Sequence, residues 1–130
     1  MIANSESQLT NEDVLALIFH VASRMQKPIT IPLLSELVVE ARRKKLFTGT
    51  IPVRPAPDGY YSEYLAEHAA LMIEGGLARK INPLVITDEG DRLLQKSLDE
   101  IKERNPEQAR AWLNFLKDNL THRSNQEASK

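Results

Sequence analysis

The chain has 130 residues, and its 17 Lys and Arg against 18 Asp and Glu give a formal charge of −1 at pH 7. This length predicts a single domain, and 42% hydrophobic with 27% charged residues exclude both wholesale disorder and a fibrous repeat. Because cysteine is absent, disulfides, zinc–thiolate sites, iron–sulfur clusters and cysteine nucleophiles are excluded as well.

The sequence carries no recognisable targeting or membrane-spanning segment. The first ten residues have no basic start and no apolar stretch, and no segment approaches the ~18 consecutive apolar residues of a membrane span. We therefore expect a cytoplasmic protein. We expect residues 1–10 to be a flexible N-terminus, residues 11–120 to form the domain, and the small, polar residues 121–130 to be a flexible tail.

Two helices are predicted in the first third of the chain. Apolar residues recur at helical spacing over residues 10–25, and Thr10 is placed to cap the start of this helix. A short extended piece is expected over residues 29–31. Thr30 then serves as the N-cap of a second helix that runs to about residue 45.

In the middle of the chain, apolar residues no longer recur at a regular spacing. Residues 46–59 contain one glycine and three prolines before a final Asp-Gly pair, so they predict a long loop, extended in part over residues 50–53. A third helix is predicted to begin at residue 61 or 62 and to end at residue 74. Gly75 and Gly76 supply its left-handed stop.

Two short β-favouring runs follow, over residues 77–81 and 84–86, and predict a two-stranded hairpin. Because Pro83 cannot adopt the positive φ of a tight type I′ turn, the loop is expected to be wider than two residues or the pairing imperfect. Two further helices are predicted over residues 87–104 and 106–120. They begin at the N-cap Thr87 and at Asn105-Pro106.

This order, mainly α with a small β-hairpin, is also the order of winged helix-turn-helix domains. Residues 71–80 (LMIEGGLARK) resemble the end of their third helix and their first wing strand. Residues 84–94 (LVITDEGDRLL) resemble the second wing strand and the threonine-capped helix after it. The chain is similar to small bacterial and phage-associated winged-helix proteins, in which Tyr61-Ser62-Glu63 and His68 have counterparts. The resemblance implies a winged helix with an extended C-terminal helix pair, acting as a DNA-binding regulator of transcription.

Positive charge gathers over residues 42–54, which contain five Lys or Arg and no acidic residue. These cations are predicted to contact phosphates, together with two cations on the hairpin, and polar groups around the third helix are predicted to read bases. A solvated helix end is the alternative for the cations. The predicted DNA-binding residues are Arg42, Arg43, Lys44, Lys45, Arg54, Tyr60, Ser62, Tyr64, His68, Arg79 and Lys80.

The third helix argues for a different partner, because Asp58, Glu63, Glu67 and Glu74 surround it without one Lys or Arg. The rival hypothesis is therefore a winged-helix adaptor that binds a host or phage protein and not duplex DNA. Cations that share one side with the third helix and the hairpin would favour DNA. An isolated basic corner beside an acidic helix would favour the adaptor.

Aromatic and aliphatic residues along the last helix predict a homodimer seam, because aromatic side chains are enriched at interface centres. The candidate seam residues are Trp112, Phe115, Leu116 and Leu120. Alternatively this helix folds over the first helix and completes the core of the single chain.

No catalytic residue, metal ligand or cofactor is predicted. His20, His68 and His122 are far apart in the sequence, and there is no glycine-rich phosphate loop or nucleophile elbow. The protein is expected not to be an enzyme. Its predicted partners are duplex DNA and a second copy of the chain, with a protein partner under the rival hypothesis.

Overall fold

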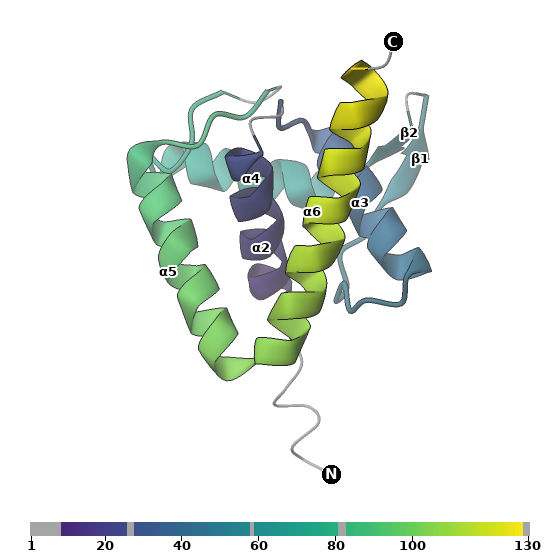
Figure 1. Ribbon diagram of the computed structural model, residues 1–130. Helices are drawn as coiled ribbons and strands as arrows, with labels where there is room; N and C mark the ends of the chain where they lie inside the picture. The colour runs from purple at the N-terminus through teal and green to yellow at the C-terminus, as the bar shows by residue number, and fades with distance from the viewer. Residues whose placement is uncertain (1–8, 26–27, 58, 81–82, 129–130) are drawn as a thin grey trace.

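The structure is a computed structural model, and it describes residues 9–25, 28–57, 59–80 and 83–128. Within these residues the chain is mainly helical with one small antiparallel hairpin (Figure 1), as the sequence predicts. The elements are α2 (Asn11–Arg24), α3 (Ile31–Arg43), β1 (Arg54–Ala56), β2 (Gly59–Tyr61), α4 (Glu63–Glu74), α5 (Asp88–Arg104) and α6 (Pro106–Ala128).

Side-chain caps explain where the helices start. The Thr10 hydroxyl accepts from the Asp13 backbone N–H at 3.1 Å, and the Asp13 carboxylate accepts from the Thr10 N–H at 3.0 Å. This capping box satisfies two backbone donors that have no partner within α2. Thr30, Ser62 and Thr87 cap α3, α4 and α5 in the same way, each accepting from a backbone N–H three residues on.

Helix α2 lies at the centre of the molecule, between α5 and α6, which meet at Asn105 and diverge like the arms of a V (Figure 1). Its apolar side chains, among them Leu15, Ile18 and Phe19, are fully buried. Trp112 of α6 joins them in the same core. Helix α3 packs against β2 and α4 on the other side of the molecule.

The strands lie where the sequence predicts an irregular loop. Arg54 pairs with Tyr61 and Ala56 with Gly59, so the strands occupy residues 54–56 and 59–61 and not the predicted residues 50–53. The prolines of this segment argue against a strand, but a two-stranded ribbon consists of edges alone, where proline is tolerated. Asp58, at the turn, lies outside the described residues.

In the described residues 77–80 and 84–86 no strand is present, and the predicted pairing is confined to a single bridge. Ala78 bridges Ile86, with the Arg79 N–H donating to the Val85 carbonyl at 2.7 Å. Lys80 already has a φ of 71°, and this left-handed backbone ends the pairing after one bridge. Residues 81 and 82 lie outside the described part.

Ile29 adds a further bridge, to Leu84, and the Leu84 N–H donates to the Ile29 carbonyl at 2.7 Å. The extended piece predicted before α3 is therefore present at Ile29, whereas Ile31 already belongs to the helix. Three chain segments that are distant in sequence thus meet through backbone hydrogen bonds at the top of the molecule as drawn in Figure 1.

The end of α4 matches the prediction, whereas the ends of α3 and α6 do not. Helix α4 ends at Glu74, and Gly76 with a φ of 77° provides the left-handed stop. Helix α3 ends at Arg43, two residues early. Helix α6 continues to Ala128 through most of the predicted flexible tail over 121–130. No glycine or proline follows Pro106, so nothing in the sequence terminates this helix.

Candidate functional site

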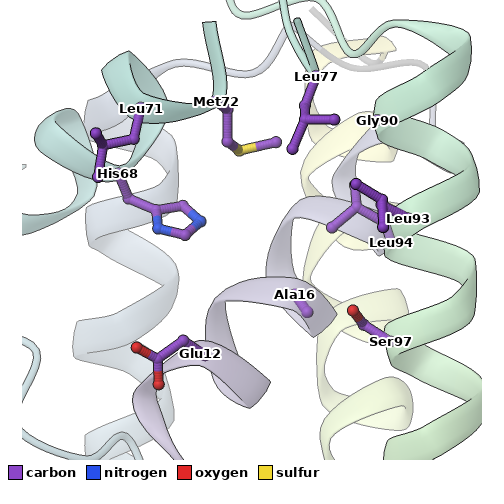
Figure 2. Close-up of a pocket in the computed structure, with 10 residues that line it drawn as sticks. All are labelled: Glu12, Ala16, His68, Leu71, Met72, Leu77, Gly90, Leu93, Leu94 and Ser97. Atoms are coloured by element: carbon purple, nitrogen blue, oxygen red, sulfur yellow. The ribbon is translucent and has the colours of Figure 1, made fainter. Parts of the chain in front are cut away.

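Helices α2, α4 and α5 enclose a pocket of about 330 Å³, hereafter the α4–α5 pocket (Figure 2). Most of its wall is apolar and includes Met72 and Leu77 beside α4 and Leu94 on α5. Figure 2 shows the ring of His68 turned toward this space. Apolar walls with a few convergent polar groups are typical of ligand and peptide sites. The polar groups of this pocket are Glu12, His68 and Ser97.

The two most exposed large hydrophobic side chains in the described part of the chain both line this pocket. Leu71 of α4 is 64% exposed and Leu93 of α5 is 43% exposed. A single exposed leucine is ordinary on a soluble protein, but two exposed leucines that line one apolar pocket indicate a contact surface. This pair is therefore the strongest sign of a binding site on the α4–α5 side.

His68 is the one histidine at this pocket, and its ring lies 5.5 Å from the ring of Phe19, centroid to centroid. Burial lowers the pKa of His68 below its usual 6.5, and the nearby Glu12 carboxylate opposes this shift in part. Desolvation disfavours the imidazolium, so the ring is neutral at pH 7. The ionised Glu12 carboxylate then makes the pocket negative.

The residues predicted to read bases do not share one outward face. Ser62 is fully buried, and its hydroxyl accepts from the Leu65 N–H at 3.2 Å, so this side chain is a helix cap and cannot reach a base. The hydroxyl of Tyr64 accepts from the Asn11 amide at 3.3 Å. Tyr60 accepts from a guanidinium, and His68 lies at the pocket.

Three of the residues predicted to contact phosphate are instead bonded within the protein. They are Arg42, Arg43 and Arg54. Arg42 donates to the Thr48 hydroxyl at 3.2 Å and to the carbonyl of Ile51, which ties the loop after α3 to that helix. Arg43 is paired with Glu40 at 2.9 Å and donates to the Tyr60 hydroxyl at 3.3 Å.

Arg54 lies on β1, where its guanidinium pairs with the Glu63 carboxylate at 2.8 Å and covers the Tyr61 ring at 5.2 Å. The hydrogen bond from Arg54 lowers the pKa of the Glu63 carboxyl and keeps it ionised. The sequence shows the cations without their partners, because Glu40 and Glu63 lie outside the basic segment that it singles out.

The remaining predicted cations fall into two separate groups. Lys44 and Lys45 are exposed at the end of α3, at the lower right of Figure 1. Arg79 and Lys80 are exposed on the segment between α4 and α5, at the top of the figure. The structure thus separates the basic corner at the end of α3 from the predicted wing.

The predicted dimer seam is inside the molecule. Trp112 is 1% and Phe115 8% exposed, and their rings meet edge to face at 5.6 Å. Leu116 and Leu120 are fully buried. Because α6 packs against α2, α5 and α3, its apolar stripe completes the core of the single chain, which is the alternative that the sequence left open.

Among the described residues, no group of three His, Asp or Glu side chains is placed to hold a metal ion. His20 is hydrogen-bonded to Gln95 at 3.0 Å and does not line the pocket that His68 faces. The side chain of His122 lies outside the described part. We therefore assign no residue of the described part a role as catalytic acid, base or nucleophile.

Sequence patterns did not single out the α4–α5 pocket. Leu71, Met72 and Ile73 are consecutive apolar residues in a helix, and three such residues cannot all face the same side. One of them was therefore expected to face solvent. This run of apolar residues is the feature of the sequence that could have pointed to Leu71 as an exposed hydrophobic side chain. Glu12 and Ser97 carried no signal, because only the packing of α2 against α5 brings them to one pocket.

Comparison of the chain with protein-family models, with curated proteins and with solved structures finds no match. None of the helices in the described part of the chain combines the length and the apolar character needed to cross a membrane. The proposals below therefore depend on the chain's own residues.

Proposed function

We propose that this protein is a protein-binding adaptor on a winged-helix-like scaffold, and that the α4–α5 pocket receives an apolar side chain of its partner. The observation that carries the proposal is the exposure of Leu71 and Leu93 at the mouth of one apolar pocket. Hydrophobic anchors that fill such pockets supply much of the energy of protein interfaces.

The charge of α4 favours a basic partner segment over a polyanion. The exposed side of this helix carries Glu67 and Glu74 together with Glu63, which is paired with Arg54 of β1, and the helix itself carries no Lys or Arg. Docking this side into a DNA groove would bring its carboxylates close to phosphates, whereas a basic peptide gains from the same charges. The bound segment is therefore amphipathic, with an apolar anchor next to Lys or Arg.

The winged-helix-like scaffold is part of the same proposal. Its supports are the order of the helices and the backbone bridges Ile29–Leu84 and Ala78–Ile86, which join the segment before α3 to the segment between α4 and α5. In this arrangement α4 takes the place of the helix that regulators insert into DNA. Its surface chemistry then suits a different ligand.

The adaptor is tested by affinity capture from nuclease-treated lysate with the wild-type protein, Leu71→Ser and Leu93→Ser. We expect a stoichiometric protein partner whose affinity falls about tenfold or more in each variant, because an interface anchor is removed. The matched control is Phe47→Ser, since Phe47 is 37% exposed but lies outside the pocket. Equal capture by all four proteins, or no partner, contradicts the proposal.

Duplex DNA is the second candidate, favoured by the exposed Lys44 and Lys45 at the end of α3. Titration with duplex DNA at several salt concentrations separates the two candidates. Binding that weakens with salt and with Lys44→Gln and Lys45→Gln supports DNA, because each phosphate contact releases counterions. Absence of binding at low salt rejects it.

A further inference from the structure

A second recess lies on the other side of α5, between α5 and α6. Two adjoining hollows of about 390 and 360 Å³ share Lys102, Leu113 and Lys117, so together they form one groove, hereafter the α5–α6 groove. The two helices meet at Asn105 and diverge from this junction (Figure 1). No residue of the α4–α5 pocket belongs to this groove.

The groove is positively charged. Lys102, Arg110 and Lys117 line it, and none of its lining residues is acidic. Within the described residues, no ion pair or hydrogen bond engages these three side chains. Arg24, at the far end of the groove, is by contrast paired with Asp91 at 3.1 Å. Three exposed cations thus line one recess, and an anion bound there is attracted by all three.

An apolar wall continues from the cations along the groove. Val21 and Met25 of α2 and its C-cap, together with Leu98 of α5 and Leu113 of α6, form this part. A ligand that spans the groove therefore meets positive charge near the helix junction and, beyond it, apolar side chains beside the polar side chains of His20, Arg24 and Gln95. This division suits an amphipathic anion.

We propose that the α5–α6 groove binds a small phosphorylated molecule whose remaining part is apolar or aromatic. Three cations match a multivalent anion, whereas a single carboxylate neutralises one of them. The planar guanidinium of Arg110 can donate two parallel hydrogen bonds to phosphate oxygens, and the ammonium groups of Lys102 and Lys117 add point charges. The apolar part of the ligand lies against Leu98 and Leu113.

The surrounding surface favours a compact ligand over a long polyanion. Glu103 and Asp118 directly follow the lining residues Lys102 and Lys117 in the chain, and both are exposed. Glu107 is exposed at the start of α6. A nucleic-acid backbone needs a continuous basic track, and these carboxylates interrupt it on either side of the groove.

The test is isothermal titration calorimetry of the full chain with ADP, pyrophosphate and adenosine as probes, in buffer without phosphate. We expect saturable one-to-one binding of ADP, weaker binding of pyrophosphate, and none of adenosine. Lys102→Gln and Lys117→Gln should each weaken ADP about tenfold, because each removes a charged hydrogen bond. Lys96→Gln, an exposed α5 cation outside the groove, is the matched control and should leave ADP binding unchanged.

Amide chemical shifts of the wild-type protein give a second reading that does not depend on any variant folding. ADP should shift the signals of Lys102, Arg110 and Leu113 and leave those of Leu71 and Leu93 in place. The proposal is overturned by the absence of saturable ADP binding, by equal losses in Lys96→Gln and Lys102→Gln, or by an acidic peptide that binds this groove more tightly than ADP. Failure of this test leaves the α4–α5 adaptor surface untouched.

Discussion

His68 shows how one side chain links burial to a measurable property. Its ring lies against Phe19 and faces the α4–α5 pocket, and burial lowers its pKa while the Glu12 carboxylate raises it less strongly. A group whose pKa differs between the folded and unfolded chain makes the free energy of unfolding depend on pH.

Lowering the pH from about 7.5 to about 5.5 should therefore destabilise the protein through His68. The unfolded His68 binds a proton near its ordinary pKa of about 6.5, and the folded ring binds it only at lower pH. Between the two values the unfolded state holds more protons, so the free energy of unfolding falls as the pH falls. Urea denaturation at several pH values measures this loss.

The His68→Gln variant is the control, since glutamine does not titrate. It should lose less stability than the wild-type protein over the same pH range, with the contributions of the other histidines common to both proteins. Identical pH profiles for the two proteins would show that the environment of His68 does not disfavour its charged form.

The start of α5 depends on a contact that only glycine permits. A Cβ atom at Gly90 would lie 2.0 Å from the carbonyl oxygen and 2.9 Å from the carbonyl carbon of Leu77. Both are backbone atoms of the bridged segment between α4 and α5, so they cannot rotate out of the way. Gly90 thus lets the first turn of α5 approach the chain that precedes it.

Gly90→Ala should lower the free energy of unfolding by about 1–3 kcal/mol, as overpacking typically does. Helix propensity alone predicts the opposite sign, because alanine favours a helix interior over glycine. Gly75→Ala is the matched control. Its Cβ would lie 3.5 Å from the nearest atom, the Leu71 carbonyl oxygen, and its φ is −84°. Thermal and urea unfolding of both variants decide whether the steric contact prevails over propensity, and a stabilised Gly90→Ala would refute it.

At the level of the whole chain, α6 closes the core over α2. Trp112 and Leu116 lie in the same buried cluster as Ile18 and Phe19, although 81 residues lie between the two helices in the sequence. The apolar stripe of α6, which in the sequence suggests a dimer seam, is buried within the single chain. The surfaces that we propose for ligands are the α4–α5 pocket and the α5–α6 groove, which share no lining residue.

Trp112→Ala should lower the free energy of unfolding by about 3–5 kcal/mol, the usual cost of deleting a buried Trp side chain. If Trp112 belongs to the core of the single chain, its removal changes stability without changing the molecular mass in solution of the fraction that stays folded. Asn114→Ala, at an exposed position of the same helix, should leave stability nearly unchanged. Denaturation and sedimentation velocity together make the measurement. If the wild-type protein is a dimer and Trp112→Ala is a folded monomer, the hypothesis that α6 forms the dimer interface is supported instead.

The helix starts and the end of α4 could be predicted from the amino-acid sequence because they depend on contacts within a few residues. Three helices begin at a threonine whose hydroxyl accepts a hydrogen bond from the backbone N–H three positions on, namely Thr10, Thr30 and Thr87. Gly76 adopts the left-handed conformation that ends α4. These local hydrogen bonds and backbone preferences need no tertiary partner. The mainly helical architecture and the order of its helices follow from them.

Packing decided the rest, since it sets which faces of these helices meet. Arg54 is a free cation in the sequence but pairs with Glu63 once β1 lies beside α4, and the stripe of Trp112 becomes core once α6 crosses α2. The α4–α5 pocket exists only because α2, α4 and α5 converge, so Glu12 and Ser97 had no signal in the chain order. Helix caps and left-handed stops depend on neighbouring residues, whereas charge pairing, burial and cavities arise from contacts between residues that are distant in the sequence.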